Sequence, residues 1–170
     1  MTPDERLPAG ILPAMPFPKF GFALTVCLAL AGCDAPDTTW RQTPEAETLG
    51  WGMNVWGPSG DELYVVGGNP ERGAVLRERA GEWAPLPVPE GVGLVNWAHG
   101  FGDGDVYFVA NGGRALRWDG ESFEVWDTPT TEDLWGIWGV APDDLWAVGG
   151  SGLETSEAVI LHFDGEAWSQ

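Results

Sequence analysis

Hydrophobic and polar positions alternate over three stretches of the chain, and the same pattern returns about every 40 residues. Each copy passes from a turn containing glycine or proline into an apolar strand that ends in glycine: LYVVGG from Leu63, VYFVANGG from Val106 and LWAVGG from Leu145. A second element recurs at identical length: Leu76 to Trp83, Leu116 to Phe123 and Leu161 to Trp168. Strand-like alternation at this period predicts an array of β repeats.

Each repeat is predicted to contain four short strands, which is the content of one β-propeller blade. The Asp-Gly pairs Asp119-Gly120 and Asp164-Gly165 lie between strand-like flanks and predict two-residue hairpin turns. The predicted fold class is therefore all-β: a partial β-propeller of about three four-stranded antiparallel blades, preceded by a disordered or cleaved leader. The repeats are placed at about 50–88, 93–129 and 134–170, within a domain spanning 40–170.

Aromatic residues set the phase of the repeats. Trp40, Trp83, Phe123 and Trp168 return at about the repeat period, so Trp40 is assigned to an outer strand. Trp56, Trp83, Trp138 and Trp168 occupy recurring positions and are predicted to pack between adjacent blades. Trp51, Trp97 and Trp126 do not recur, and for them too a core position is favoured over a ligand platform.

The N-terminal part carries a different signal. Phe20 to Leu30 is uniformly apolar and follows Lys19; it is too short to span a bilayer and is typical of the hydrophobic region of a signal peptide. It ends in Leu30-Ala31-Gly32-Cys33, which resembles the bacterial lipobox. The resemblance implies that residues 1–32 are cleaved, that Cys33 carries diacylglycerol and that 33–39 is a lipidated tether. Met15 is an alternative start, because the leader before Lys19 is poor in basic residues.

A lipid anchor at Cys33 places the mature domain outside the cytoplasm, in the bacterial cell envelope, on an inner or outer membrane that the sequence does not specify. Several acyl chains would hold the protein firmly, whereas one chain binds membranes only marginally. Cys27 lies in the leader, so Cys33 is the single mature cysteine and no disulfide is expected. Stability must then come from side-chain packing across the repeats.

Composition and charge narrow the class further. Twenty-five Gly, 14 Pro and 11 Trp indicate many short strands joined by tight turns, and a hydrophobic fraction of 44% argues against disorder. The net charge of −18 excludes nucleic acid as a partner, because phosphate binding requires a basic surface.

Acidic turns recur at Asp61-Glu62, Asp103-Gly104-Asp105 and Asp143-Asp144. Each offers two carboxylates, whereas Ca²⁺ takes six or more oxygen ligands, so capping of backbone groups is favoured over a metal site. No metal or cofactor is predicted. Arg77, Arg117 and His162 occupy one equivalent repeat position and are predicted to pair with neighbouring carboxylates.

The glycine pair followed by paired aromatic residues resembles kelch-like repeats of the galactose-oxidase type. Blades with this Trp-Gly, Asp-Asp, Gly-Gly pattern resemble those in lipoproteins of myxobacteria, and the resemblance covers roughly 40–170. It implies a propeller. A copper oxidase of that type needs His and Tyr ligands, and the chain offers only His99, His162, Tyr64 and Tyr107. Common nucleophile, phosphate-binding and zinc-hydrolase motifs do not occur, and no catalytic residue is assigned.

Three loops that follow the glycine pairs differ most in length: Gly67 to Gly73, Asn111 to Arg114 and Gly149 to Glu157. Variable loops on a constant framework are where specificity usually lies, so ligand contacts are predicted there. The predicted function is a membrane-anchored, non-catalytic binding or scaffold module for a protein or glycan. The alternative is a fragment of a carbohydrate-active propeller enzyme, whose paired carboxylates would come from distant loops.

Three repeats are fewer than the four or more blades of typical propellers, and exposed sheet edges invite association. The chain is expected to be the front of a longer protein that supplies further blades. The alternative is that several copies associate to close one ring.

Overall fold

The computed structural model describes residues 39–40, 42–102, 104–151 and 158–170. The chain divides into two units, Met1–Thr39 and Trp40–Gln170, and the second unit holds nearly all described residues. The predicted leader, Cys33 and most of the tether lie outside the described residues. Among the residues that are described, no helix is long and apolar enough to cross a membrane.

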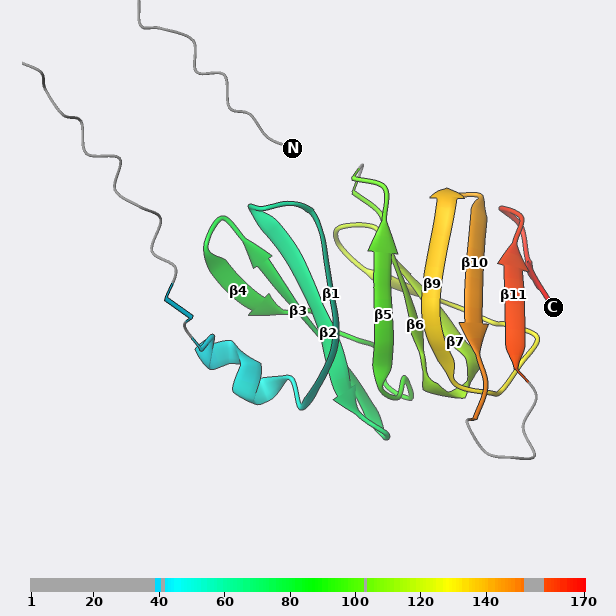
Figure 1. Cartoon of the computed structure of the whole chain (residues 1–170), viewed down its shortest axis with the longest axis horizontal. Coiled ribbons are helices and arrows are strands. Elements are labelled where there is room, and N and C mark those ends of the chain that lie inside the picture. Colours follow the sequence, from blue (N-terminus) through cyan, green and yellow to red (C-terminus); the bar gives the residue numbers. More distant parts are fainter. Residues whose placement is uncertain (1–38, 41, 103, 152–157) are drawn as a thin grey trace, which may run out of the picture. The chain divides into compact units, whose positions relative to one another are not determined.

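Three four-stranded antiparallel sheets follow one another along the chain, and each forms one blade (Figure 1). The first blade contains β1 (Trp51–Ser59), β2 (Glu62–Asn69), β3 (Arg72–Arg79) and β4 (Glu82–Pro85). The second contains β5 (Val95–Gly100), β6 (Val106–Ala110), β7 (Arg114–Trp118) and β8 (Phe123–Trp126). The third contains β9 (Leu134–Ala141), β10 (Asp144–Gly149), β11 (Val159–Phe163) and β12 (Trp168–Ser169). The predicted partial β-propeller of three blades is confirmed.

Within each blade the strands pair in chain order, so β1, β5 and β9 are the inner strands and β4, β8 and β12 the outer ones. The inner strands of successive blades lie next to one another, β1 by β5 and β5 by β9, as Figure 1 shows. β-bulges interrupt β1 between Gly52 and Asn54, and β5 between Val95 and Trp97. A bulge increases the local twist of a strand, which suits strands at the centre of a propeller.

The hydrophobic core consists of two clusters, one between each pair of successive blades. The first joins Tyr64 and Val66 of blade one to Phe108 of blade two, and the second joins Tyr107 and Val109 of blade two to blade three. Successive side chains of a strand point to opposite faces. β6 therefore contributes to both clusters, and all five of its residues are buried. Burial on both faces explains its continuous apolar sequence.

The turn between the third and fourth strands differs from the sequence-based prediction. Phe123 pairs with Trp118, which leaves a four-residue connection at 119–122 instead of a two-residue turn at Asp119-Gly120. The Asp119 carboxylate accepts hydrogen bonds from the backbone N–H groups of Glu121 and Ser122, both at 2.8 Å. Such a side-chain cap stabilises the wider turn. Asp164 does the same in blade three, so both two-residue predictions are wrong.

A two-residue hairpin occurs in blade one, where the chain has no Asp-Gly pair. Arg79 pairs with Glu82, and the intervening Ala80 and Gly81 have φ angles of 53° and 88°. Positive φ at both central positions is the requirement of a type I′ turn, and only Gly meets it without steric cost.

Trp40 does not belong to an outer strand, and this prediction is also wrong. Its side chain is 99% exposed, and a short 3₁₀ helix, η1 (Pro44–Thr48), lies between it and β1. Leu49, directly after η1, is buried. The apolar contact that leads the chain into blade one therefore comes from Leu49.

The two-sided burial of β6 leads to a test of stability. Changing Val109, which is fully buried, to Ala should lower the free energy of unfolding by about 2 to 3 kcal/mol, because two methyl groups are lost and a cavity remains. Val125→Ala in the same blade, at a position 39% exposed, is the control and should change it by less than about 1 kcal/mol. Urea denaturation followed by tryptophan fluorescence measures both. Equal losses would contradict the assignment of Val109 to a core between blades.

Candidate functional site

The first two predicted ligand loops are short turns fixed to the framework. In the segment Gly67 to Gly73, Gly68 pairs with Gly73 and Asn69 with Arg72, so only Pro70-Glu71 lie outside the strands. The Asn69 side chain accepts hydrogen bonds from the N–H groups of Glu71 and Arg72 at 3.0 and 2.9 Å. The hairpin is therefore closed by its own side-chain cap.

The segment Asn111 to Arg114 contains a single 3₁₀ turn, η2 (Asn111–Gly113). The N–H of Gly112 donates to the Asp133 carboxylate at 2.9 Å, and Asn96 donates to the Asn111 side chain at 2.9 Å. Asp133 directly precedes the inner strand β9, and Asn96 lies in the inner strand β5. The turn is thus held against the start of the inner strands.

The third predicted loop, Gly149 to Glu157, is described only up to residue 151. Gly149 belongs to β10, and the Gly150 carbonyl accepts a hydrogen bond from the Trp135 indole at 2.6 Å. Residues 152–157 lie outside the described residues. That ligand contacts occur in these three loops stays a prediction.

The predicted pairing of Arg77, Arg117 and His162 with nearby carboxylates is confirmed in all three blades. The pairs are Arg77 with Glu62 at 2.5 Å, Arg117 with Asp105 at 2.8 Å, and His162 with Asp144 at 2.9 Å. Each joins the third strand of a blade to a carboxylate from its acidic turn or the adjacent strand end. One carboxylate of each acidic turn is thereby engaged. Over the described residues, no group of three or more His, Cys, Asp or Glu could hold a metal ion.

The pair in blade one forms a small hydrogen-bonded network. Burial opposes ionisation of Glu62, but hydrogen bonds from Arg77 and from the Tyr64 hydroxyl outweigh it and lower the pKa of Glu62. Burial and the hydrogen bond to Glu62 raise the pKa of Tyr64 to about 12. Tyr64 therefore remains a protonated donor, and Glu62 a carboxylate, at neutral pH.

His99 lies among aromatic side chains of the inner strands. Its ring is 6.5 Å from that of Trp56 and 6.4 Å from that of Trp138, measured between centroids. Burial lowers the pKa of His99, partly offset by a hydrogen bond with the backbone of Gly139. A neutral, packed imidazole fits a framework role.

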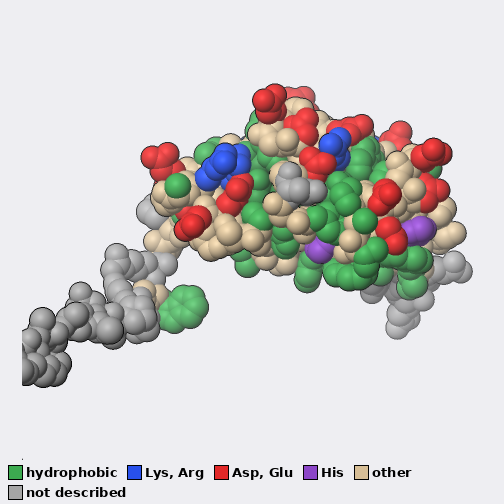
Figure 2. All heavy atoms as spheres, turned by 90° about the horizontal axis from the view of Figure 1, so that it is seen from above, with side chains coloured by type: hydrophobic (Ala, Val, Ile, Leu, Met, Phe, Trp, Pro, Cys, Tyr) green, Lys and Arg blue, Asp and Glu red, His purple; other side chains and the backbone are tan. Residues whose placement is uncertain are grey.

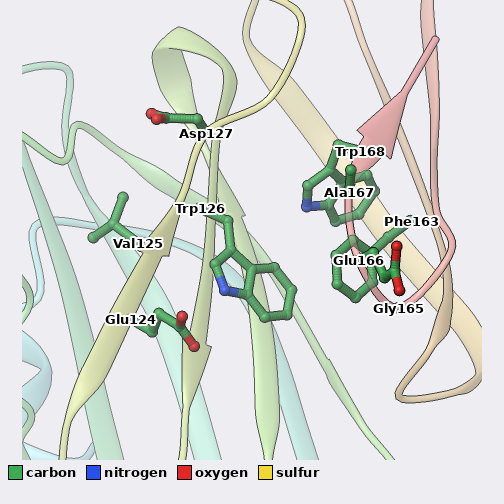
Figure 3. A pocket seen from close by; sticks show the side chains of 9 residues that line it. All are labelled: Glu124, Val125, Trp126, Asp127, Phe163, Gly165, Glu166, Ala167 and Trp168. Atoms are coloured by element: carbon green, nitrogen blue, oxygen red, sulfur yellow. The ribbon is translucent and has the colours of Figure 1, made fainter.

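A groove of about 520 Å³ separates the outer strand of blade two from the last hairpin of blade three. It is lined by Glu124, Trp126 and Asp127 on one side and by Phe163, Glu166 and Trp168 on the other (Figure 3). The Trp126 ring stacks on Phe163, with centroids 4.7 Å apart and an interplanar angle of 18°. The groove therefore combines aromatic surface with carboxylate oxygens.

Trp168 lines this groove and carries a buried indole N–H. Its side chain is 8% exposed, and among the described residues its Nε1 finds no hydrogen-bond partner. Figure 3 shows the nitrogen edge of the indole on the side that faces β8. A buried donor without a partner costs about 1 to 3 kcal/mol.

Sequence reasoning treated Trp126 and Trp168 as core residues and did not single out Glu124 or Glu166. The two blades that border the groove differ by an exchange of ring types. Blade two places Trp118 on β7 and Phe123 on β8, whereas blade three places Phe163 on β11 and Trp168 on β12. The exchange puts an indole N–H on the outer strand of blade three.

Comparison with known structures finds a similar chain described as "YCF48 bound to D1 peptide". Sequence identity is 15% and the TM-score is 0.37. The alignment covers 71% of this chain and 53% of the other, so the chain spans about half the length of that structure. No family model and no curated protein matches the chain. The blade assignment follows from the strand pairing of the chain itself.

The depressed pKa of Glu62 gives a pH-dependent contribution to stability. A carboxylate whose pKa lies lower in the folded state than its ordinary 4.5 stabilises the fold above pH 4.5, and this is lost as the pH falls through 4.5 and then through the lowered value. Glu62→Gln should therefore be less stable than the native chain at pH 7, and the difference should shrink as the pH falls below 4.5.

Urea denaturation at both pH values measures this difference. Glu90→Gln makes the same change in net charge at an exposed loop position and serves as control. A deficit for Glu62→Gln that is equally large in acid would contradict an ionised Glu62 as its cause.

Proposed function

We propose that the chain is a membrane-anchored lipoprotein of the bacterial envelope whose blades act as a non-catalytic binding or scaffold module. The lipobox-like Leu30-Ala31-Gly32-Cys33 supports the anchor. The groove between blades two and three supports the binding role. The observation that carries the binding role is the Trp168 indole, whose residue lines that groove and whose buried Nε1 has no hydrogen-bond partner among the described residues.

The groove suits a ligand that has both hydrogen-bond donors and acceptors. The Trp168 indole donates, the carboxylates of Glu124 and Glu166 accept, and Trp126 adds apolar surface. β8 borders the groove and is the last strand of its sheet. An edge strand can bind an extended segment through backbone hydrogen bonds. These features favour an extended protein segment over a glycan.

The anchor is tested on the full chain expressed in a Gram-negative bacterium. Intact mass should show a species that begins at Cys33 and carries diacylglycerol and acyl groups, and this species should partition into detergent. Cys33→Ala should stay unlipidated, because the thiol is the acceptor. Cys27→Ala is the matched control and should be processed normally, since Cys27 lies in the leader. An unmodified Cys33 in the native chain would rule out the anchor.

The groove is tested with two conservative substitutions in the full chain. Trp168→Phe keeps an aromatic ring but removes the N–H, and should weaken the binding of peptides selected from an array of extended peptides by about tenfold. Trp118→Phe removes another buried, unpartnered indole N–H that lies outside the lining of this groove. It should leave binding unchanged while controlling for the loss of ring size.

An oligosaccharide array provides the opposing result. Capture of glycans alone would reject a protein ligand, and turnover of an oligosaccharide would reject the non-catalytic module. Replacing Glu124 and Glu166 by Gln then separates two roles of the carboxylates. If the carboxylates act only as hydrogen-bond acceptors, the Gln variant still binds, because its amide oxygens also accept.

A further inference from the structure

The outer segments of blades one and two can be compared position by position, because their strands pair in the same register. They differ at three places, with Ala84, Leu86 and Pro87 in blade one against Glu124, Trp126 and Asp127 in blade two. Leu86 packs against the core between blades one and two. Since blade one forms without charges at these places, the fold does not require the carboxylates of blade two.

The residues of the groove face one another across two blades. Glu124 and Trp126 are two residues apart on β8, so their side chains point to the same face of the strand. Trp126 stacks on Phe163, so this face is the one toward blade three. Figure 3 shows the Trp126 ring between Glu124 and the hairpin that carries Glu166. The groove therefore presents aromatic surface flanked by carboxylates from both blades.

The charge of this groove differs from that of other hollows in the described part of the chain. Three carboxylates line it, those of Glu124, Asp127 and Glu166, and no basic residue does. Three other hollows each include at least one arginine: Arg77 and Arg79 in one, Arg72 in another and Arg117 in a third. The groove is thus distinctly acidic within a chain whose net charge is already −18.

Nearby arginines leave most of this negative charge in place. Arg117 donates its hydrogen bonds to a different carboxylate and lies 3.6 Å from Glu124. Arg114 lies 3.4 Å from Asp127, whose side chain is 99% exposed. Exposed pairs of this kind contribute little. Among the described residues, Glu166 forms no ion pair.

We infer that the groove binds a lysine or arginine side chain of an extended protein segment. The methylene groups of such a side chain pack on the aromatic surface of Trp126, while its charged end meets Glu124 and Glu166. An acidic segment is repelled by the same carboxylates. The inference names the chemistry of the ligand at the proposed binding site, so it rests on the proposed function.

The test uses a library of extended eight-residue peptides, each synthesised with lysine, acetyllysine or glutamate at one central position. Fluorescence anisotropy measures their binding to the full chain in mild detergent. The lysine forms should bind about three- to tenfold more tightly than the acetyllysine forms, because acetylation removes the charge. The glutamate forms should bind most weakly. The preference for lysine should shrink as salt is added, because exposed charges are screened.

Two matched double variants place this preference at the groove. Glu124→Gln combined with Glu166→Gln keeps the hydrogen-bond acceptors but removes two charges, and should abolish most of the preference for lysine. Glu90→Gln combined with Glu121→Gln makes the same change in net charge at exposed positions outside the groove and should retain it. Glu121 occupies the turn position in blade two that Glu166 occupies in blade three.

The outcomes separate this inference from the proposed function. Peptides that bind equally well with lysine and acetyllysine, and lose affinity in Trp168→Phe, would overturn the inference and leave a peptide-binding groove. A preference for lysine that falls equally in both double variants would show attraction by the net charge alone and would also overturn it. A library without any binder would reject the proposed function and the inference together.

Discussion

Contact between the faces of successive blades is the interaction on which the rest of the structure depends. A four-stranded sheet of this size cannot bury its apolar side chains alone, and each blade here uses its neighbour as the missing half of a core. β6 shows the consequence most clearly, because Phe108 faces blade one while Tyr107 and Val109 face blade three. Among the described residues, the middle blade is therefore the one covered on both faces.

Polar side chains lie outside the contact between blades. The pairs Arg77 with Glu62 and Arg117 with Asp105 lie at the ends of the strands, where a carboxylate from the acidic turn meets a cation on the third strand. Figure 2 shows acidic side chains spread over the surface in this view, with few basic ones among them. The pairs remove some repulsion in a chain whose net charge is −18. Between the outer strands the blades diverge, and there the groove beside Trp126 opens.

The blades could be predicted from the sequence because short apolar strands that return within a repeat of fixed length leave few alternative folds, as the strand from Val106 shows. The pairing of Arg117 with a carboxylate could also be predicted, because acidic and basic residues recur at matching positions of the repeats. The hairpin turns could not be predicted, since Asp119 caps the backbone only once the wider loop exists. Trp40 was misplaced because periodicity alone says nothing of whether a strand partner is present. The groove depends on how far β8 and β12 separate, which no local pattern encodes.

The exchange of Trp118 and Phe123 for Phe163 and Trp168 illustrates how a repeat acquires a specific feature without losing its framework. Blades two and three each keep one large and one smaller ring in tilted contact, with centroids 4.7 Å apart in blade two and 5.4 Å in blade three. The apolar volume between the third and fourth strands is therefore nearly constant, whereas the position of the indole N–H changes. The indole N–H thus moves from the third strand in blade two to the outer strand in blade three while the paired rings are kept.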